Sequence, residues 1–183
     1  MRAIPVIITV GWIAFWLYWL ASAFGVKAGR SRWRRCAGLR VAILLIVLVL
    51  LRIRAVRTAL APVRDPALQA VGLALFVLGL ALAVWARVHI GRNWGTPMSQ
   101  KVDPELVTDG PYRRVRHPIY SGIVLAMTGT ALAVDLYWLV AVALLGAYFL
   151  YSAVMEERYM TGLFPERYPA YQRSTKMLIP FIL

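Results

Sequence analysis

The chain has 183 residues, of which 61% are hydrophobic, and its formal net charge is +13. This apolar content excludes a disordered chain, and the single cysteine excludes a disulfide-stapled scaffold. The basic residues lie between long apolar runs and not on a soluble body, which excludes a nucleic-acid-binding domain and favours an integral membrane protein.

Four apolar runs predict membrane-spanning helices, and they cover residues 3–26, 67–86, 118–134 and 136–155. Only Asp135 separates the last two, so we expect them to form a tight helical hairpin. A fifth run, 41–51, is uncharged for only eleven residues and is flanked by arginines. It spans the bilayer if those arginines snorkel from its ends, and otherwise it lies in the interface.

The distribution of basic residues favours five spans over four. With five spans, sixteen of the 21 Lys and Arg residues lie on the face that carries 25–40, 87–116 and the C-terminal tail, whereas four spans divide them almost evenly. The positive-inside rule then places the N-terminus outside and the C-terminus in the cytoplasm. The excess of Arg over Lys is typical of a GC-rich genome, so we expect a bacterial inner membrane.

The predicted fold is therefore all-α: a polytopic membrane protein of five transmembrane helices, the last two forming a tight hairpin, in a single domain over 1–183. Two substantial hydrophilic segments, 87–117 and 156–177, fall on the predicted cytoplasmic face. Because they share a face, we expect them to form one site.

Residues 116–120 carry the first candidate chemistry. Pro118 suits the first position of a helix, which places His117 where free N–H groups and the helix dipole favour an anion. Tyr120 then projects less than one turn deeper. These side chains either grip a polar ligand at the membrane boundary, or Arg116 anchors to lipid phosphate and the other two are ordinary interfacial residues. The local pattern alone favours the interfacial interpretation.

The loop just before this motif offers the elements of a pocket. Leu106 and Val107 would form a wall, and Tyr112, after the Gly-Pro turn, would stack on a flat ring. The alternative is a connecting loop whose basic residues touch anionic lipid.

Glu156 and Glu157 follow at the end of the last apolar run. Adjacent carboxylates point about 100° apart on a helix, and negative charge is unfavourable at a helix C-terminus. A cationic ligand group, or an arginine such as Arg113 or Arg116, would compensate them; alternatively Arg158 and the basic loop neutralise them.

The segment 164–173 mixes aromatic and charged residues and predicts either a short amphipathic helix over the site or a plain interfacial anchor.

Several chemistries lack their sequence pattern. There is no glycine-rich dinucleotide turn and no Walker sequence, and two histidines with one cysteine give no metal-ligand spacing. We therefore expect no metal site.

Taken together, five pieces resemble the isoprenylcysteine carboxyl methyltransferase family. They are residues 91–94, residues 106–108 with 110–112, residues 116–120, residues 156–158, and a tail with Tyr168, Tyr171 and Pro180. In this order, with a two-helix hairpin between the third and fourth pieces, they are fairly specific. The resemblance covers roughly 85–183.

The resemblance implies a multi-helix membrane enzyme that uses S-adenosylmethionine. By position, the cofactor site would be lined by Gln100, Leu106, Val107, Tyr112, His117, Pro118, Ile119, Tyr120 and Glu156. Arg116 and Glu157 are the candidate catalytic residues, and Arg113 and Ser152 the candidate substrate-binding residues. The expected partners are membrane lipids and a lipophilic small-molecule or lipidated acceptor, without nucleic acid or metal.

Two departures bear on the substrate. Ser152 stands where prenylcysteine methyltransferases carry a substrate-binding arginine, and Pro104 stands where relatives often have histidine. The first change removes the natural anchor for an acidic acceptor. We therefore predict methyl transfer to a small lipophilic acceptor, and an isoprenylcysteine-like carboxylate stays open as that acceptor. The alternatives are an NADPH-dependent membrane reductase related to sterol reductases and a non-catalytic membrane partner protein.

Overall fold

The computed structural model describes residues 3–23, 29–31, 62–94, 99–101 and 105–178. Helices dominate this part of the chain, and two three-residue strands, β1 and β2, pair antiparallel with Arg30 opposite Gln100. The elements in chain order are α1 (Ala3–Ser22), β1 (Gly29–Ser31), α4 (Pro66–Ile90), η2 (Gly91–Asn93), β2 (Ser99–Lys101), η3 (Gly110–Arg113), α5 (Pro118–Ala133), α6 (Trp138–Leu163) and α7 (Arg167–Ser174).

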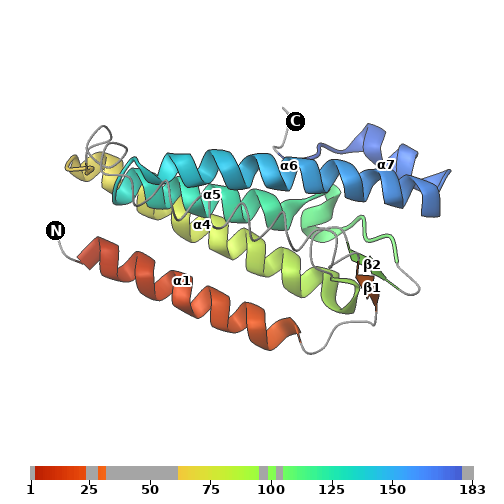
Figure 1. Cartoon of the computed structure of the whole chain (residues 1–183), viewed down its shortest axis with the longest axis horizontal. Helices are drawn as coiled ribbons and strands as arrows, with labels where there is room; N and C mark the ends of the chain where they lie inside the picture. The colour runs from red at the N-terminus through yellow and green to blue at the C-terminus, as the bar shows by residue number, and fades with distance from the viewer. Residues whose placement is uncertain (1–2, 24–28, 32–61, 95–98, 102–104, 179–183) are drawn as a thin grey trace.

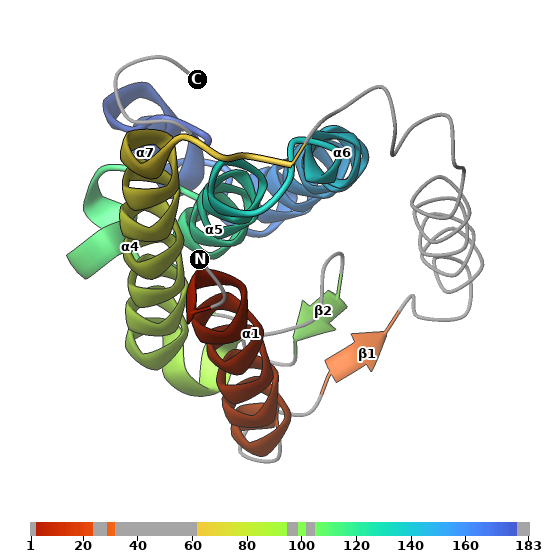
Figure 2. The same cartoon turned by 90° about the vertical axis from the view of Figure 1, so that its left-hand side faces the viewer.

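The four long helices lie side by side along the long axis of the molecule (Figure 1). Viewed along the bundle, α5 lies between α4 and α6, and α1 packs below α4 and α5 (Figure 2). The C-terminal ends of α1, α4 and α6 gather at one end of the bundle with α7 and the two short strands (Figure 1). The hydrophilic segments that were expected to share a face therefore meet at this end.

Glycines allow α4 and α5 to pack with their backbones in close contact. The glycines form two pairs, each spaced seven residues along its helix: Gly72 and Gly79 on α4, and Gly122 and Gly129 on α5. A Cβ at Gly129 would lie 2.3 Å from the Phe76 backbone nitrogen. A Cβ at Gly79 would lie 2.4 Å from the Ala126 nitrogen. Small residues at the contact are typical of helices that pack within a membrane.

Aromatic side chains attach α1 to this pair. Trp12 donates from Nε1 to the Thr130 hydroxyl at 3.1 Å, and Phe15 and Trp19 stack with their ring centroids 4.9 Å apart. Trp19 meets Trp94 edge to face. The buried cluster so formed reaches from α1 through α4 to the start of α5.

Within the described residues, three helices are long and apolar enough to cross a membrane: Ala3–Ser22, Pro66–Asn93 and Trp138–Leu163. Their outward faces expose large apolar side chains such as Leu17, Leu78 and Leu150, as lipid-facing helices do. The fourth apolar helix, Pro118–Ala133, has 16 residues and so extends about 24 Å, less than the ~30 Å hydrocarbon core.

Each of the predicted runs 3–26, 67–86, 118–134 and 136–155 overlaps a helix, and the last of these helices continues eight residues beyond its predicted end, to Leu163. Residues 24–26 and 41–51 lie outside the described residues. α1 and α4 run in the same direction (Figure 1), as a five-span order requires, since two consecutive spans would be antiparallel. The count of five and the transmembrane hairpin stay predictions.

Candidate active site

Tyr112 lies in η3 and is held against the end of α4 by three contacts. Its hydroxyl donates to the Ala86 carbonyl at 3.3 Å, its ring stacks on His89, and its own carbonyl accepts from Tyr171 of α7 at 2.5 Å. Burial raises the pKa of the Tyr112 phenol above its ordinary value. The side chain and the backbone carbonyl of Tyr112 thereby connect the loop to α4 and α7.

The turn before Tyr112 requires a glycine. Gly110 has φ +54°, and a Cβ there would lie 2.6 Å from the His89 ring. His89 Nε2 lies 2.9 Å from Asp109 Oδ1, and this hydrogen bond lowers the pKa of the Asp109 carboxyl. The Gly-Pro turn predicted from sequence is thus built around the His89 side chain.

The C-terminal tail runs beside the residues that lead into α5. The backbone nitrogen of Arg116 donates to the Lys176 carbonyl at 2.8 Å, and that of His117 donates to the Met177 carbonyl at 3.0 Å. Pro118 occupies the first turn of α5, as predicted, and its position needs no donor. His117 therefore lies at the helix mouth, between the helix and the tail.

A stack of three rings leads from this mouth to α6. His117 and Tyr120 lie parallel with centroids 5.5 Å apart, and Tyr120 stacks on Phe149 at 4.7 Å. The Tyr120 hydroxyl donates to Glu156 Oε1 at 2.7 Å, and His117 Nδ1 lies 3.6 Å from Glu156 Oε2. Glu156 keeps about a quarter of its side chain exposed, so its carboxylate is positioned but still accessible.

The second ring nitrogen of His117 is buried without a hydrogen-bond partner. It lies 3.3 Å from Glu157 Oε1, but the alignment does not satisfy a hydrogen bond. A buried polar atom without a partner costs free energy and is a common feature of sites that bind ligands.

Arg116 and Glu157 form a nearly buried ion pair. Arg116 Nε lies 2.6 Å from Glu157 Oε1 and its Nη2 lies 3.4 Å from Oε2, and the two side chains are 9% and 8% exposed. Arg116 Nη1 donates to the carbonyls of Thr175 and Gln172, and the Gln172 amide donates to Glu157 at 2.7 Å. The pair therefore fixes α7 and the tail against α6.

The two adjacent glutamates consequently have different environments, as their 100° separation predicts. Glu157 is bound by Arg116 and Gln172, which corresponds to the predicted compensation by an arginine. Glu156 instead faces the ring stack of α5. Of the two carboxylates, Glu156 is the more exposed, with 26% of its side chain exposed against 8% for Glu157.

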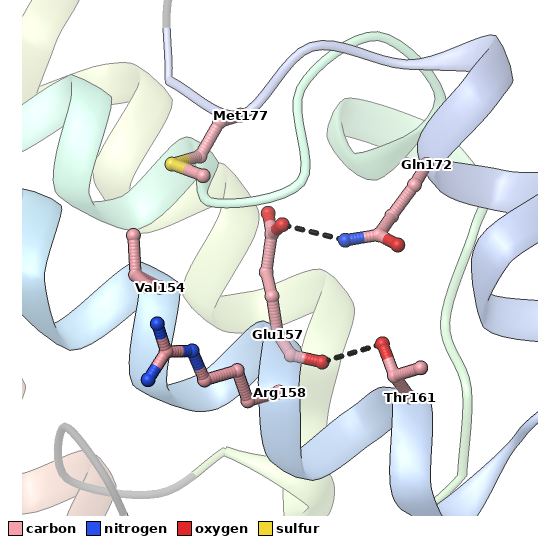
Figure 3. A pocket seen from close by; sticks show the side chains of 6 residues that line it. All are labelled: Val154, Glu157, Arg158, Thr161, Gln172 and Met177. Atoms are coloured by element: carbon pink, nitrogen blue, oxygen red, sulfur yellow. Dashed lines mark hydrogen bonds between the residues drawn. The ribbon is translucent and has the colours of Figure 1, made fainter.

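A cavity of about 330 Å³ opens beside this network. Four of its lining residues come from one face of α6, one from α7 and one from the tail: Val154, Glu157, Arg158, Thr161, Gln172 and Met177 (Figure 3). Of the residues predicted from sequence, Glu157 alone lines this cavity. The cavity thus lies next to the predicted cofactor residues, on the neighbouring face of α6.

The remaining predicted residues divide into those near the ring stack and those away from it. Val107 packs against the buried cluster that contains Tyr112, Ile119 and Tyr120, and Leu106 is half-buried beside it in sequence. Gln100 lies in β2, where its backbone pairs with Arg30. Pro104 and Pro180 lie outside the described residues.

Neither candidate substrate residue lines the cavity beside α6. Arg113 is exposed in η3, while Ser152 is fully buried and donates its hydroxyl to the Tyr148 carbonyl of its own helix at 2.9 Å. The serine that replaces the family arginine thus fills a packing position between α6 and its neighbours.

Two groups of residues near the site were not predicted from the sequence. Gln172 and Thr175 bind the Arg116–Glu157 pair, and with Tyr168 and Tyr171 they follow the i, i+3, i+4, i+7 spacing of one helix face, which would have revealed them. Arg87 is 5% exposed, donates to the carbonyls of Ser22 and Gly91 and covers the Trp94 ring at 4.6 Å. No sequence signal distinguishes it from an interfacial arginine.

Comparison with models of protein families identifies the family of this chain. A model described as phospholipid methyltransferase matches residues 68–167, more than half of the chain and the segment that carries α4, α5, α6 and the ring stack. The chain belongs to the phospholipid methyltransferase family. It is therefore related to membrane-embedded methyltransferases, as the sequence motifs predicted.

Curated relatives agree with this assignment at modest identity. The chain is 30% identical over 118 residues to protein-S-isoprenylcysteine O-methyltransferase of Schizosaccharomyces pombe, covering 62% of the chain and 50% of the relative. It is 33% identical over 111 residues to the cobalt-zinc-cadmium resistance protein CzcN of Cupriavidus metallidurans, covering 59% and 49%. The chain spans about half the length of these relatives. The predicted resemblance to isoprenylcysteine methyltransferases is thus confirmed.

Proposed function

We propose that the protein is an S-adenosylmethionine-dependent methyltransferase that acts on a small lipophilic acceptor within a bacterial inner membrane. Family membership supports the reaction class, and three apolar helices of membrane-spanning length support the location. In this proposal the chain crosses five times, with its N-terminus outside and the candidate site on the cytoplasmic side, where a soluble methyl donor is present.

One observation carries the cofactor assignment. Three features meet at one place: a buried His117 nitrogen that lies 3.3 Å from Glu157 but makes no aligned hydrogen bond, a Glu156 carboxylate that is about a quarter exposed, and the N-terminal end of α5. S-adenosylmethionine carries a carboxylate, an ammonium and a sulfonium, so it needs both an anion site and an anionic partner. The residues present fit such a group.

Each of these residues then has a distinct task. The first-turn N–H groups of α5 and its dipole bind the carboxylate end of the cofactor, and Glu156 attracts its cationic groups. Tyr120 holds the Glu156 carboxylate through the 2.7 Å hydrogen bond. Val107, Ile119 and Tyr112 supply apolar and aromatic wall next to the stack.

S-adenosylmethionine supplies an electrophilic methyl group, and displacement from a sulfonium requires donor and acceptor in line and shielded from water. The chain would contribute chiefly alignment. We assign Arg116 and Glu157 to positioning of α7 and the tail over the site, because their polar atoms bind each other and that segment. This revises their expected catalytic role.

The acceptor class follows from the membrane setting. An apolar acceptor can diffuse between the helices while the cofactor enters from the aqueous side. Because buried Ser152 replaces the arginine of the prenylcysteine enzymes, the acceptor need not be an isoprenylcysteine carboxylate.

The test is isothermal titration calorimetry of S-adenosylmethionine against the protein in nanodiscs. We expect micromolar to sub-millimolar binding, weakened about tenfold by His117→Ala and by Glu156→Gln. Glu166→Gln is the matched control, since Glu166 is an exposed carboxylate at the start of α7. Absence of binding would refute the proposal, and saturable NADPH binding without S-adenosylmethionine binding would favour a reductase.

A further inference from the structure

Arg158 is a free cation at the wall of the cavity beside α6. Its side chain is exposed and forms neither an ion pair nor a hydrogen bond within the described part of the chain. Figure 3 shows its guanidinium turned toward Val154 and away from the Glu157 carboxylate. The neighbouring acid therefore does not neutralise it.

The other polar groups of the cavity are already engaged. Glu157 is bound by Arg116 and by the Gln172 amide, and the Thr161 hydroxyl donates to the Glu157 carbonyl. Val154 and Met177 supply apolar wall. The uncompensated charge of the cavity is thus the single positive charge of Arg158, and the space beside it suits an anionic group.

The face of α6 that leads to Arg158 is apolar. Leu150, Tyr151 and Val154 precede it at helical spacing on the same stripe, and the first two are 40% and 50% exposed. α6 is long and apolar enough to span the bilayer and ends at Leu163, about 8 Å beyond Arg158 along the axis. Arg158 therefore lies at the depth of lipid headgroups, above a surface that suits a hydrocarbon chain.

We propose that this cavity binds the anionic group of the lipid-like acceptor, with Arg158 as its contact and the Leu150–Val154 stripe as the path of its hydrocarbon chain. The identification of the bound lipid as the methyl acceptor rests on the proposed function, whereas the presence of a binding site for an anionic lipid does not. In this proposal Arg158 takes the place of the arginine that prenylcysteine methyltransferases carry at position 152. Arg158 lies six residues later, on a different face of α6.

The experiment uses the full chain in phosphatidylcholine nanodiscs that contain a trace of one diazirine lipid: oleic acid, phosphatidylglycerol or the uncharged diacylglycerol. After irradiation, mass spectrometry quantifies labelled peptides from α6 to the tail. We expect saturable labelling by an anionic probe, about two- to fivefold lower in Arg158→Gln and largely retained in Arg158→Lys. Labelling by oleic acid alone identifies a carboxylate ligand, and labelling by phosphatidylglycerol alone identifies a phosphate ligand.

Arg173→Gln is the matched control, because Arg173 is an exposed arginine of α7 that does not line the cavity. Equal labelling by diacylglycerol, no change in Arg158→Gln, or an equal loss in Arg173→Gln would overturn the site and indicate general interfacial attraction.

Calorimetry on the same variants separates the two proposals. Arg158→Gln should bind S-adenosylmethionine as the unmodified protein does. Loss of that binding with unchanged lipid labelling would overturn the assignment and place Arg158 with the cofactor. Arg158-dependent labelling in a protein that binds no S-adenosylmethionine would support the lipid site while refuting the proposed function.

Discussion

Arg116 and Glu157 are paired through two contacts, 2.6 Å from Nε to Oε1 and 3.4 Å from Nη2 to Oε2, with less than a tenth of either side chain exposed. Arg116 comes from the residues before α5 and Glu157 from α6, and Arg116 also binds two carbonyls at the end of α7. One ion pair thus connects the three segments that surround the candidate site.

Removal of the arginine should destabilise the protein strongly. Arg116→Ala leaves the Glu157 carboxylate buried without its cation, which costs about 3–5 kcal/mol. We expect a clearly lower midpoint of thermal unfolding in detergent, whereas Arg114→Ala, at an exposed neighbouring position, should change little. The double variant Arg116→Met/Glu157→Gln should recover part of the loss, because no unpaired charge is left. Equal midpoints for Arg116→Ala and Arg114→Ala would contradict the assigned role of the pair.

The contact between α4 and α5 should tolerate no added methyl group. In Gly129→Ala the new Cβ would meet the Phe76 backbone nitrogen at 2.3 Å, so the helices must separate, and a loss of about 1–3 kcal/mol is expected. Gly146→Ala is the internal control, because a Cβ there meets nothing within 4 Å and alanine favours the helix by about 0.5–1 kcal/mol. Differential scanning fluorimetry of the two variants should show opposite shifts. A neutral Gly129→Ala would disprove the close packing.

The buried tyrosines give a pH dependence with a definite sign. Burial raises the pKa values of Tyr112, Tyr168 and Tyr171 above the ordinary value of 10.0. Their contribution to stability is therefore complete below pH 10.0 and is lost as the pH rises toward the folded-state values, because the unfolded chain ionises first. Ultraviolet titration should show these phenolates appearing only above pH 10.0. If Tyr171→Phe removed a phenolate that forms near pH 10.0, the buried position of Tyr171 would be wrong.

Tyr120 should act on the cofactor through Glu156. Tyr120→Phe keeps the ring between His117 and Phe149 but removes the 2.7 Å hydrogen bond to the carboxylate. We expect S-adenosylmethionine affinity to fall by roughly tenfold with little change in unfolding midpoint. Tyr151→Phe, on the exposed face of α6, should leave affinity unaltered. Equal affinity in the two variants would argue that Tyr120 only packs.

The sequence predicted the four described apolar helices well, because hydropathy is a local property, whereas the site built on them stays a proposal. Pro118 at the start of a helix, Gly110 in a turn and the divergence of Glu156 from Glu157 all follow from short-range geometry. The contact of Arg116 and His117 with the tail also agrees with the prediction, made from the apolar spans and the loop charges, that these two segments share a face.

Side-chain partners over long range could not be predicted in the same way. Arg116 appeared free to act on a substrate, yet its donors bind Glu157 and α7. Ser152 appeared to face the acceptor, yet it is packed inside the bundle. These contacts depend on which face of α6 packs against which neighbouring segment. The cavity, which residues as far apart in the sequence as Thr161 and Met177 line, depends on the same packing. The spacing of residues within one segment does not determine how segments pack together.

Transfer of a labelled methyl group tests the central claim most directly. The protein in nanodiscs is incubated with methyl-radiolabelled S-adenosylmethionine and host lipid extract, and the organic phase is counted and its products identified. The unmodified protein and Glu166→Gln should form a labelled lipid-soluble product, and Glu156→Gln should form at least about tenfold less. Label no higher than in the protein-free reaction, or equal label with Glu156→Gln, would contradict a methyltransferase centred on Glu156.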